Sequence, residues 1–186
     1  MAEAAKRYAT YEDLCRVPDN LVAEIIDGEL IVHPRPAPKH ARAASMLGGE
    51  IIYPFDKGRG GPGGWWILDE PEVHLGPDVV VPNLAGWRRE NLPRLPETAW
   101  FDLRPDWVCE VLSPATYKTD RRRKMPLYAR YQVPHLWLID PESRTLEAYR
   151  LQDGQWLLLR TFADQDEVAA EPFDAVPFEL GSLWAD

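Results

Sequence analysis

Residues 105–134, which read PDWVCEVLSPATYKTDRRRKMPLYARYQVP, decide the fold of this chain. The run Trp107–Leu112 is rich in β-branched and aromatic residues and ends at a Ser-Pro pair, which predicts a buried strand. Because side chains alternate along a strand, Glu110 shares a face with Val108 and Leu112. A carboxylate on an apolar face is costly unless it is paired or bound to a metal. Glu110 is therefore the first candidate functional residue.

The polar segment after this strand predicts an amphipathic helix. Thr119 or Asp120 is a suitable N-cap. Pro126 removes one backbone hydrogen bond, so a kink or a late start near Met125 is expected. Four side chains recur at the spacing of one helical stripe: Lys124, Leu127, Tyr128 and Tyr131. Lys124 therefore faces inward. The other cations of the segment are expected on a solvated face: Lys118, Arg121, Arg122 and Arg123.

Length and composition indicate one globular domain, residues 1–186, with enough chain for a sizeable core. The sequence has no apolar run near about 18 residues and no charged-then-apolar leader, so neither a membrane span nor a signal peptide is predicted. Cys15 and Cys109 do not have the spacing of a metal site. Two such cysteines favour a reduced, cytoplasmic protein.

The formal net charge of −9 argues against broad electrostatic capture of nucleic acid. The charge is uneven, because residues 163–186 contain no lysine or arginine. Their acids are Asp164, Asp166, Glu167, Glu171, Asp174, Glu179 and Asp186. The rest of the chain is nearly balanced, so a basic patch around residues 118–124 can still meet a phosphate backbone.

Further elements are predicted on both sides of the central stretch. Tyr8–Arg16 is expected to form a short helix with Thr10 as N-cap. Leu21–Pro34 is expected to form a hairpin that turns at Asp27-Gly28, and Lys39–Tyr53 a long helix. Strands are predicted at Trp65–Leu68, Glu72–Leu75, Val79–Val81, His135–Asp140, Thr145–Gln152 and Gln155–Phe162. This order predicts an α/β fold, with a mixed β-sheet flanked by two main helices, an N-terminal hairpin and a C-terminal antiparallel meander.

Three features of the N-terminal half have competing interpretations. Glu24, on the first hairpin strand, is either a solvent-facing residue or part of a site. His40, in the first turn of the long helix, is either a packing residue or a functional one. The segment 58–64, GRGGPGG, lacks the Lys-Ser/Thr ending of a phosphate-binding loop and follows no clear strand, so we reject nucleotide binding there.

Several short segments carry a resemblance through their order and spacing. They are EIIDGEL at 24–30, His40 opening a helix, VPNLAGW at 81–87, VCEVLSP at 108–114, Asp120-Arg121 before Lys124, Tyr128, and HLWLIDP at 135–141. On these segments the chain resembles the bacterial Uma-two group of endonucleases, within the PD-(D/E)xK restriction endonuclease-like superfamily. The resemblance covers about residues 8–184.

The resemblance implies a metal-dependent endonuclease that acts on DNA. Two acids would hold Mg²⁺ or Mn²⁺ through oxygen ligands, and the metal would clamp a phosphate and its attacking water. Glu110 would be the second of these acids. Lys124 would replace the lysine that the superfamily motif puts where this chain has Leu112, and would neutralise developing charge. Glu24 and His40 would lie at the edge of the same site.

Asn83 is the departure from the family pattern that matters most. The pattern has Pro-Asp where this chain has Pro82-Asn83, so Asn83 would be the first metal ligand. A literal Pro77-Asp78 precedes its strand and is interpreted as an unrelated turn. Asparagine is a neutral oxygen ligand, so the site loses one negative charge. Three explanations remain open: an engineered, inactivating replacement, a natural loss of activity, or an active variant with weaker metal affinity.

The leading hypothesis is a DNA endonuclease, weakened or inactive as written because of Asn83. It requires Glu110 and Lys124 to lie within about 10 Å of each other, since both must reach one phosphate. The alternative is a non-catalytic binding module on the same fold. A third hypothesis is a mainly structural homodimer joined through its aromatic strands. A purely structural Glu110–Lys124 pair also stays open, although buried pairs are often neutral for stability.

Overall fold

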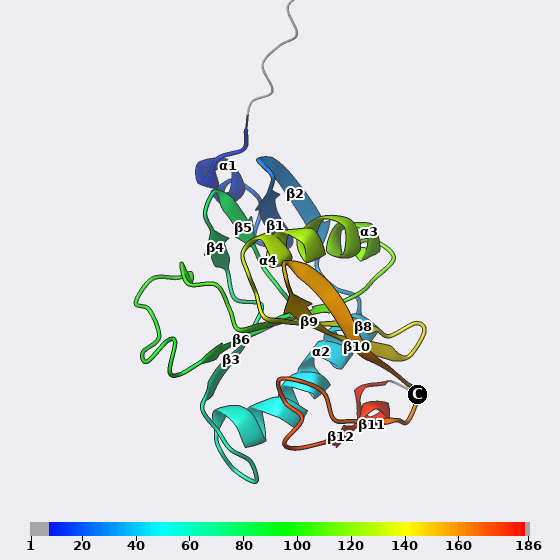
Figure 1. Ribbon diagram of the computed structural model, residues 1–186. Helices are drawn as coiled ribbons and strands as arrows, with labels where there is room; N and C mark the ends of the chain where they lie inside the picture. The colour runs from blue at the N-terminus through cyan, green and yellow to red at the C-terminus, as the bar shows by residue number, and fades with distance from the viewer. Residues whose placement is uncertain (1–7, 185–186) are drawn as a thin grey trace, which may run out of the picture.

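The computed structural model describes residues 8–184 and contains two main β-sheets with helices packed around them (Figure 1). The helical segments are α1 (Tyr11–Cys15), α2 (Pro38–Ile51), the π-helix η1 (Ile52–Asp56), α3 (Tyr117–Thr119), the π-helix η2 (Asp120–Lys124), α4 (Met125–Arg130) and the 3₁₀ helix η3 (Leu180–Leu183). The strands are β1 (Leu21–Ile26), β2 (Glu29–Pro34), β3 (Trp65–Asp69), β4 (Val73–Leu75), β5 (Asp78–Val80), β6 (Leu84–Arg88), β7 (Trp107–Val111), β8 (His135–Asp140), β9 (Thr145–Gln152), β10 (Gln155–Ala163), β11 (Glu167–Val168) and β12 (Phe178–Glu179). Within residues 8–184, no helix is both long and apolar enough to cross a membrane.

The smaller main sheet has the strand order β2-β1-β5-β4 and contains the predicted N-terminal hairpin. Strands β1 and β2 pair antiparallel around Asp27 and Gly28, whose φ angles are +52° and +74°. Two consecutive left-handed residues match the twist of a two-residue hairpin, which is why an Asp-Gly pair suits this turn. The hairpin prediction is confirmed. Strand β5 adds to its other side through Ile25 and Val79.

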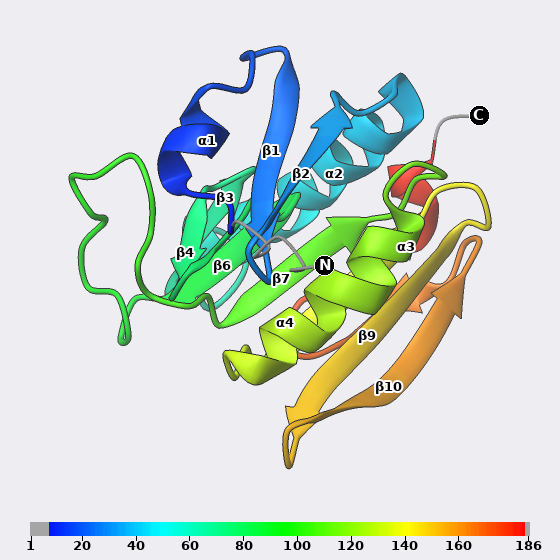
Figure 2. The ribbon, with the colours of Figure 1, turned by 90° about the horizontal axis from the view of Figure 1, so that it is seen from above.

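The larger sheet has the strand order β10-β9-β8-β7-β6-β3. Strands β7 and β8 pair in parallel and the other neighbours pair antiparallel. The parallel pair needs a crossover, which the segment α3–η2–α4 provides (Figure 2). The mixed sheet and its C-terminal meander are therefore confirmed. Strand β6 was not predicted, because a strand that is buried on both faces lacks alternation.

Strand β7 separates two apolar cores. Trp107, Cys109 and Val111 point toward α2 and pack in a core that includes Leu47 and Phe173. Val108 and Leu112 point the other way and pack with residues of α4 and of the smaller sheet, among them Leu127, Tyr128 and Ile26. Figure 1 shows α2 on one side of the larger sheet and α3–α4 on the other. Glu110 lies on the second face, as the alternation predicts.

The acidic C-terminal segment covers the core beneath α2. Its larger apolar side chains pack there, including Phe178, Leu180 and Leu183. Most of its carboxylates are exposed on the outside. Asp186 lies outside the described residues. The segment thus contributes to the core although its composition is strongly acidic.

The crossover helix begins earlier than predicted. Helical structure starts at Tyr117, so neither Thr119 nor Asp120 is its N-cap. Regular α-helical bonding resumes at Met125, as expected from Pro126, but a π-helical turn precedes it. In that turn the Met125 N–H donates to the Asp120 carbonyl oxygen, which widens the helix before the proline. Figure 2 shows these segments as one continuous helical element.

Asp78 was predicted to lie in a turn before a strand, but it belongs to the strand itself. It is the first residue of β5 and is 1% exposed. One of its carboxylate oxygens accepts the Asp27 N–H at 2.7 Å, and the other accepts the Tyr131 hydroxyl at 3.0 Å. Asp78 therefore ties the hairpin turn to the end of the crossover helix. It does not line the cavity described below, in agreement with the interpretation that this Pro-Asp pair is unrelated to the site.

Two smaller predictions have mixed outcomes. The N-terminal helix is shorter than expected, but Thr10 caps it in a reciprocal bond with Asp13. Of the cations expected on a solvated face, Arg121 and Arg123 are instead paired and half-buried. Arg121 contacts Glu147 and Arg123 contacts Glu29, each at 3.0 Å.

Candidate active site

A cavity of about 280 Å³ lies where the two sheets meet the crossover helix. Strands β1 and β2, the start of α2, the residues before β6, the end of β7 and η2 all contribute to its wall. The five residues predicted for the site line this cavity: Glu24, His40, Asn83, Glu110 and Lys124. The fold thus brings together side chains from segments that are far apart in the sequence.

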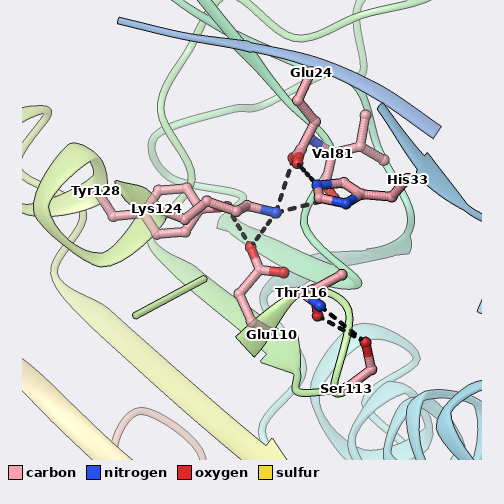
Figure 3. Close-up of polar contacts among 8 residues, drawn as sticks. All are labelled: Glu24, His33, Val81, Glu110, Ser113, Thr116, Lys124 and Tyr128. Atoms are coloured by element: carbon pink, nitrogen blue, oxygen red, sulfur yellow. Dashed lines mark hydrogen bonds and ion pairs between the residues drawn. The ribbon is translucent and has the colours of Figure 1, made fainter. Parts of the chain in front are cut away.

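Lys124 lies at the centre of the polar cluster in this cavity (Figure 3). Its Nζ is 2.8 Å from Glu24 Oε1 and 2.7 Å from Glu110 Oε1. It also donates to the Val81 carbonyl oxygen at 3.4 Å. Burial alone lowers the pKa of a lysine, but the surrounding carboxylates outweigh burial and raise the pKa of Lys124. Lys124 is therefore an ammonium although it is only 3% exposed.

Glu110 is a buried carboxyl group in direct contact with Lys124. Burial raises its pKa to about 8, the charge of Lys124 acts against this shift, and the negative charges of Asp120 and Glu24 add to it. The Tyr128 hydroxyl donates to Glu110 Oε1 at 2.5 Å. Burial thus raises the pKa of Glu110, while the ammonium of Lys124 and the hydroxyl of Tyr128 stabilise its carboxylate form.

Two further carboxylates complete the cluster. Glu24 accepts the Val81 N–H at 2.8 Å, and its other oxygen lies 3.8 Å from His33 Nε2. Asp120 is 4% exposed and lines the same cavity one helical turn before Lys124. Burial raises the pKa of Asp120, and Lys124 opposes that shift. One ammonium is thus surrounded by three carboxyl groups, and Glu24 is not the solvent-facing residue of the alternative interpretation.

Asn83 lies immediately before β6 and faces the end of β7. Its Oδ1 accepts the Val111 N–H at 2.8 Å, and its own carbonyl oxygen accepts the Glu70 N–H at 3.1 Å. The side-chain oxygen that would bind a metal is therefore already used by the backbone of the neighbouring strand. An aspartate here could keep the bond to Val111 with one oxygen and offer the other to a cation.

His40 is buried on the first turn of α2. Burial lowers its pKa, the charge of Lys124 adds to the effect, and a backbone hydrogen bond with Val111 opposes it. The ring is therefore neutral at physiological pH. Its Nδ1 is buried and has no hydrogen-bond partner among residues 8–184. His40 lines the cavity, and its Nδ1 is an unsatisfied polar atom within the wall.

The donor set fits a divalent cation only in part. Glu110 Oε1 is shared by Lys124 and Tyr128, and Asn83 Oδ1 by Val111. In the described part of the chain, no group of three or more His, Cys, Asp or Glu side chains is arranged to hold a metal ion. Two oxygen donors, one of them neutral, favour weak binding of a cation that prefers six or more oxygens.

Two residues of the cluster were not predicted as site residues. Asp120 precedes Lys124 by four residues, and that helical spacing could have placed both on one face. Tyr128 was assigned to the inward stripe, but its bond to Glu110 depends on the packing of the crossover helix on β7. No local sequence signal identifies that bond.

Comparisons with known proteins agree with this fold. The family model Uma2, described as "Putative restriction endonuclease", matches residues 8–180. A crystal structure of a "putative nuclease belonging to DUF820" from Anabaena variabilis is similar in fold, with a TM-score of 0.75 and 24% sequence identity. The similarity covers 94% of this chain and 97% of that one. Among curated proteins, none matches.

Proposed function

The chain belongs to the Uma2 family of restriction endonuclease-like proteins, and we propose that its cavity is a nuclease site that hydrolyses DNA phosphodiester bonds with a divalent cation. In this proposal the activity of the chain is weakened by Asn83. The roles of Glu110, Lys124, Asn83, Glu24 and His40 are part of the proposal. The observation that carries it is the 2.7 Å contact between Glu110 and Lys124 in a cavity that Asn83 also lines.

Lys124 is suited to stabilise negative charge. Hydrolysis of a phosphodiester develops charge on the non-bridging and leaving oxygens, and a preorganised ammonium in a dry site stabilises that charge. The charges of Glu110, Glu24 and Asp120 keep the ammonium charged, and its contacts with Glu110 and Glu24 hold it in place. The Tyr128 hydroxyl fixes the orientation of Glu110 in the same way.

Asn83 and Glu110 would hold the Mg²⁺ or Mn²⁺. When bound, such an ion polarises a phosphate and lowers the pKa of a coordinated water. Asn83 offers a neutral oxygen that already accepts the Val111 N–H, so the ion would be held weakly. This supports the weaker-affinity explanation for Asn83.

A non-catalytic binding module is the second candidate function. It is favoured by the incomplete donor set and by the internal pairing of Lys124, which already has two carboxylate partners. A homodimer joined through its aromatic strands stays a prediction, and light scattering at micromolar concentration tests it.

Cleavage of supercoiled plasmid with Mg²⁺ or Mn²⁺ tests the nuclease proposal. The variant Asn83→Asp should gain metal-dependent cleavage, because it adds the missing carboxylate. Adding Glu110→Ala to that variant should abolish the gain. Asn20→Asp is the matched control, since it adds the same charge at an exposed residue outside the cavity lining. Absence of cleavage in every variant would reject the nuclease proposal and favour the binding module.

A metal readout without cleavage accompanies this test. At a Mg²⁺ concentration about 100 times the dissociation constant, binding to the folded state alone stabilises a protein by about 2.7 kcal/mol. The Asn83→Asp variant should therefore melt at a higher temperature in Mg²⁺, and the Asn20→Asp control should not.

A further inference from the structure

An exposed ion pair lies at the entrance of the candidate active site. Arg35 Nη1 is 3.1 Å from Glu70 Oε2, and Arg35 Nη2 donates to the Asp19 carbonyl oxygen at 3.0 Å. Both Arg35 and Glu70 line the site cavity, and both also line two neighbouring cavities of about 490 and 310 Å³. The pair is thus the point at which three adjoining cavities meet.

The two neighbouring cavities extend the site in different directions. The larger one follows α1 and β1, where Tyr11 and Leu21 contribute to its wall. The other follows the first turns of α2 and includes His40 and Asn83, which belong to the site as well. An extended chain that follows the three cavities would pass Arg35 and reach the cluster around Lys124.

Arg35 is the cation that such a chain would meet. Among the residues that line the three cavities, Lys124 and Arg35 are the lysine and arginine side chains. Lys124 is 3% exposed and holds two carboxylates, whereas the Arg35 side chain is 55% exposed. The other charged residues of these walls are mainly carboxylates, which repel a phosphate, so the guanidinium of Arg35 is the exposed group suited to receive one.

The ion pair between Arg35 and Glu70 can separate at a small cost in free energy. A solvent-exposed ion pair contributes little to stability, so exchanging Glu70 for another anion costs little. Glu70 has a φ of +44°, which is uncommon for a residue other than glycine, and its N–H donates to the Asn83 carbonyl oxygen. This strained backbone holds the Glu70 carboxylate opposite Arg35 and links it directly to the site.

We propose that Arg35 binds a backbone phosphate of single-stranded DNA that enters the cavities, and that Glu70 competes with this phosphate for the guanidinium. The proposal rests on the proposed nuclease function. A single strand is favoured because Glu110 and Lys124, which line the cavity, are only 2% and 3% exposed. A flexible single strand can bend so that one phosphate enters such a space. Duplex DNA resists such bending, because it is stiff over about 150 base pairs.

The test measures binding of a fluorescein-labelled strand of twelve thymidine nucleotides. Fluorescence anisotropy reports the binding, in EDTA and between 50 and 200 mM NaCl. Arg35→Gln should weaken binding about tenfold, since it removes a charge-assisted contact. It should also make the slope of log K against log[NaCl], where K is the association constant, less steep by about 0.7. This is the amount expected for the loss of one phosphate contact on a single strand. Glu70→Gln should tighten binding, because the competing carboxylate is gone.

Arg130→Gln is the matched control. Arg130 is 53% exposed and pairs with Asp27 at 2.8 Å, so this change removes the same charge from a similar ion pair away from the three cavities. It should change the affinity by less than about twofold in this salt range. Equal losses in Arg35→Gln and Arg130→Gln would overturn the proposal. So would unchanged affinity in Glu70→Gln, no detectable binding, or an Arg35 effect seen only with duplex DNA.

The result is separable from the nuclease test, because EDTA prevents metal-dependent cleavage. Arg35-dependent binding with an inactive Asn83→Asp variant would leave the phosphate site standing and reject the catalytic function. Cleavage by Asn83→Asp together with unchanged DNA binding by Arg35→Gln would support the catalytic function and reject the phosphate site at Arg35.

Discussion

Two cation–carboxylate contacts at one cavity have similar geometry and opposite surroundings. Lys124 contacts Glu110 at 2.7 Å with both side chains 3% exposed. Arg35 contacts Glu70 at 3.1 Å with side chains 55% and 30% exposed. In the first contact the charges have left water and depend on each other. In the second contact both charges remain exposed to water, which can replace the ion-pair partner of either one.

The difference indicates a division of roles. A buried ammonium with fixed partners is preorganised, which suits a group that must stabilise charge without rearranging. An exposed guanidinium with a weakly held partner can change that partner, which suits a group that receives a ligand. Distance alone would not separate the two roles, because both pairs are within ordinary contact range.

The largest expected effect comes from breaking the buried pair. Lys124→Met should lower the free energy of unfolding by about 3–5 kcal/mol, because it leaves three carboxyl groups facing one another without their cation. Urea denaturation at neutral pH measures this change. Adding Glu110→Gln to Lys124→Met should restore part of the lost stability, since it removes one of the uncompensated charges. A loss of less than about 1 kcal/mol in Lys124→Met would place this pair in the same class as Arg35–Glu70.

A smaller effect is expected from the pH dependence of the buried pair. Because the pKa of Glu110 is raised to about 8 in the folded state, its contribution to stability is fully present below its unfolded pKa and is lost as the pH rises through about 8. Glu110→Gln does not titrate and lacks this loss. The stability of the parent relative to Glu110→Gln should therefore fall between about pH 5 and pH 9, by on the order of a few kcal/mol.

Denaturation of both proteins at the two pH values tests this sign. A relative stability that rises with pH would mean that the attraction of Lys124 exceeds the cost of burying Glu110. In that case the pair would be a simple structural ion pair.

The smallest expected effect comes from breaking the exposed pair. Arg35→Met should change the free energy of unfolding by at most about 1 kcal/mol, because both charges stay hydrated. Thermal melts of Arg35→Met and the matched Arg130→Met, each in low and in high salt, check this expectation. A large loss confined to Arg35→Met would show that the pair is a structural element of the cavity entrance and would contradict its role as an exchangeable contact.

Local signals in the sequence predicted much of the fold and the centre of the site. Asp27-Gly28 supplies two left-handed residues, so the hairpin follows from those residues alone. Side chains alternate between the two faces of the strand that contains Glu110, and they recur at helical spacing along the stripe that contains Lys124. These two repeats fix the face on which each side chain lies. The family resemblance connected the two, and in the folded chain both residues line one cavity.

The tertiary structure decided the features that join distant segments. The bond from the Val111 N–H to Asn83 spans 28 residues, and the contact between Arg35 and Glu70 spans 35. Strand β6 lacks alternation because neighbours cover both of its faces. Burial, which depends on the whole fold, sets the pKa of Glu110. The sequence by itself therefore determined which residues could form the site, while packing determined their charge, their partners and the cation that stands at its entrance, because desolvation and long-range contacts do not exist before the chain has folded.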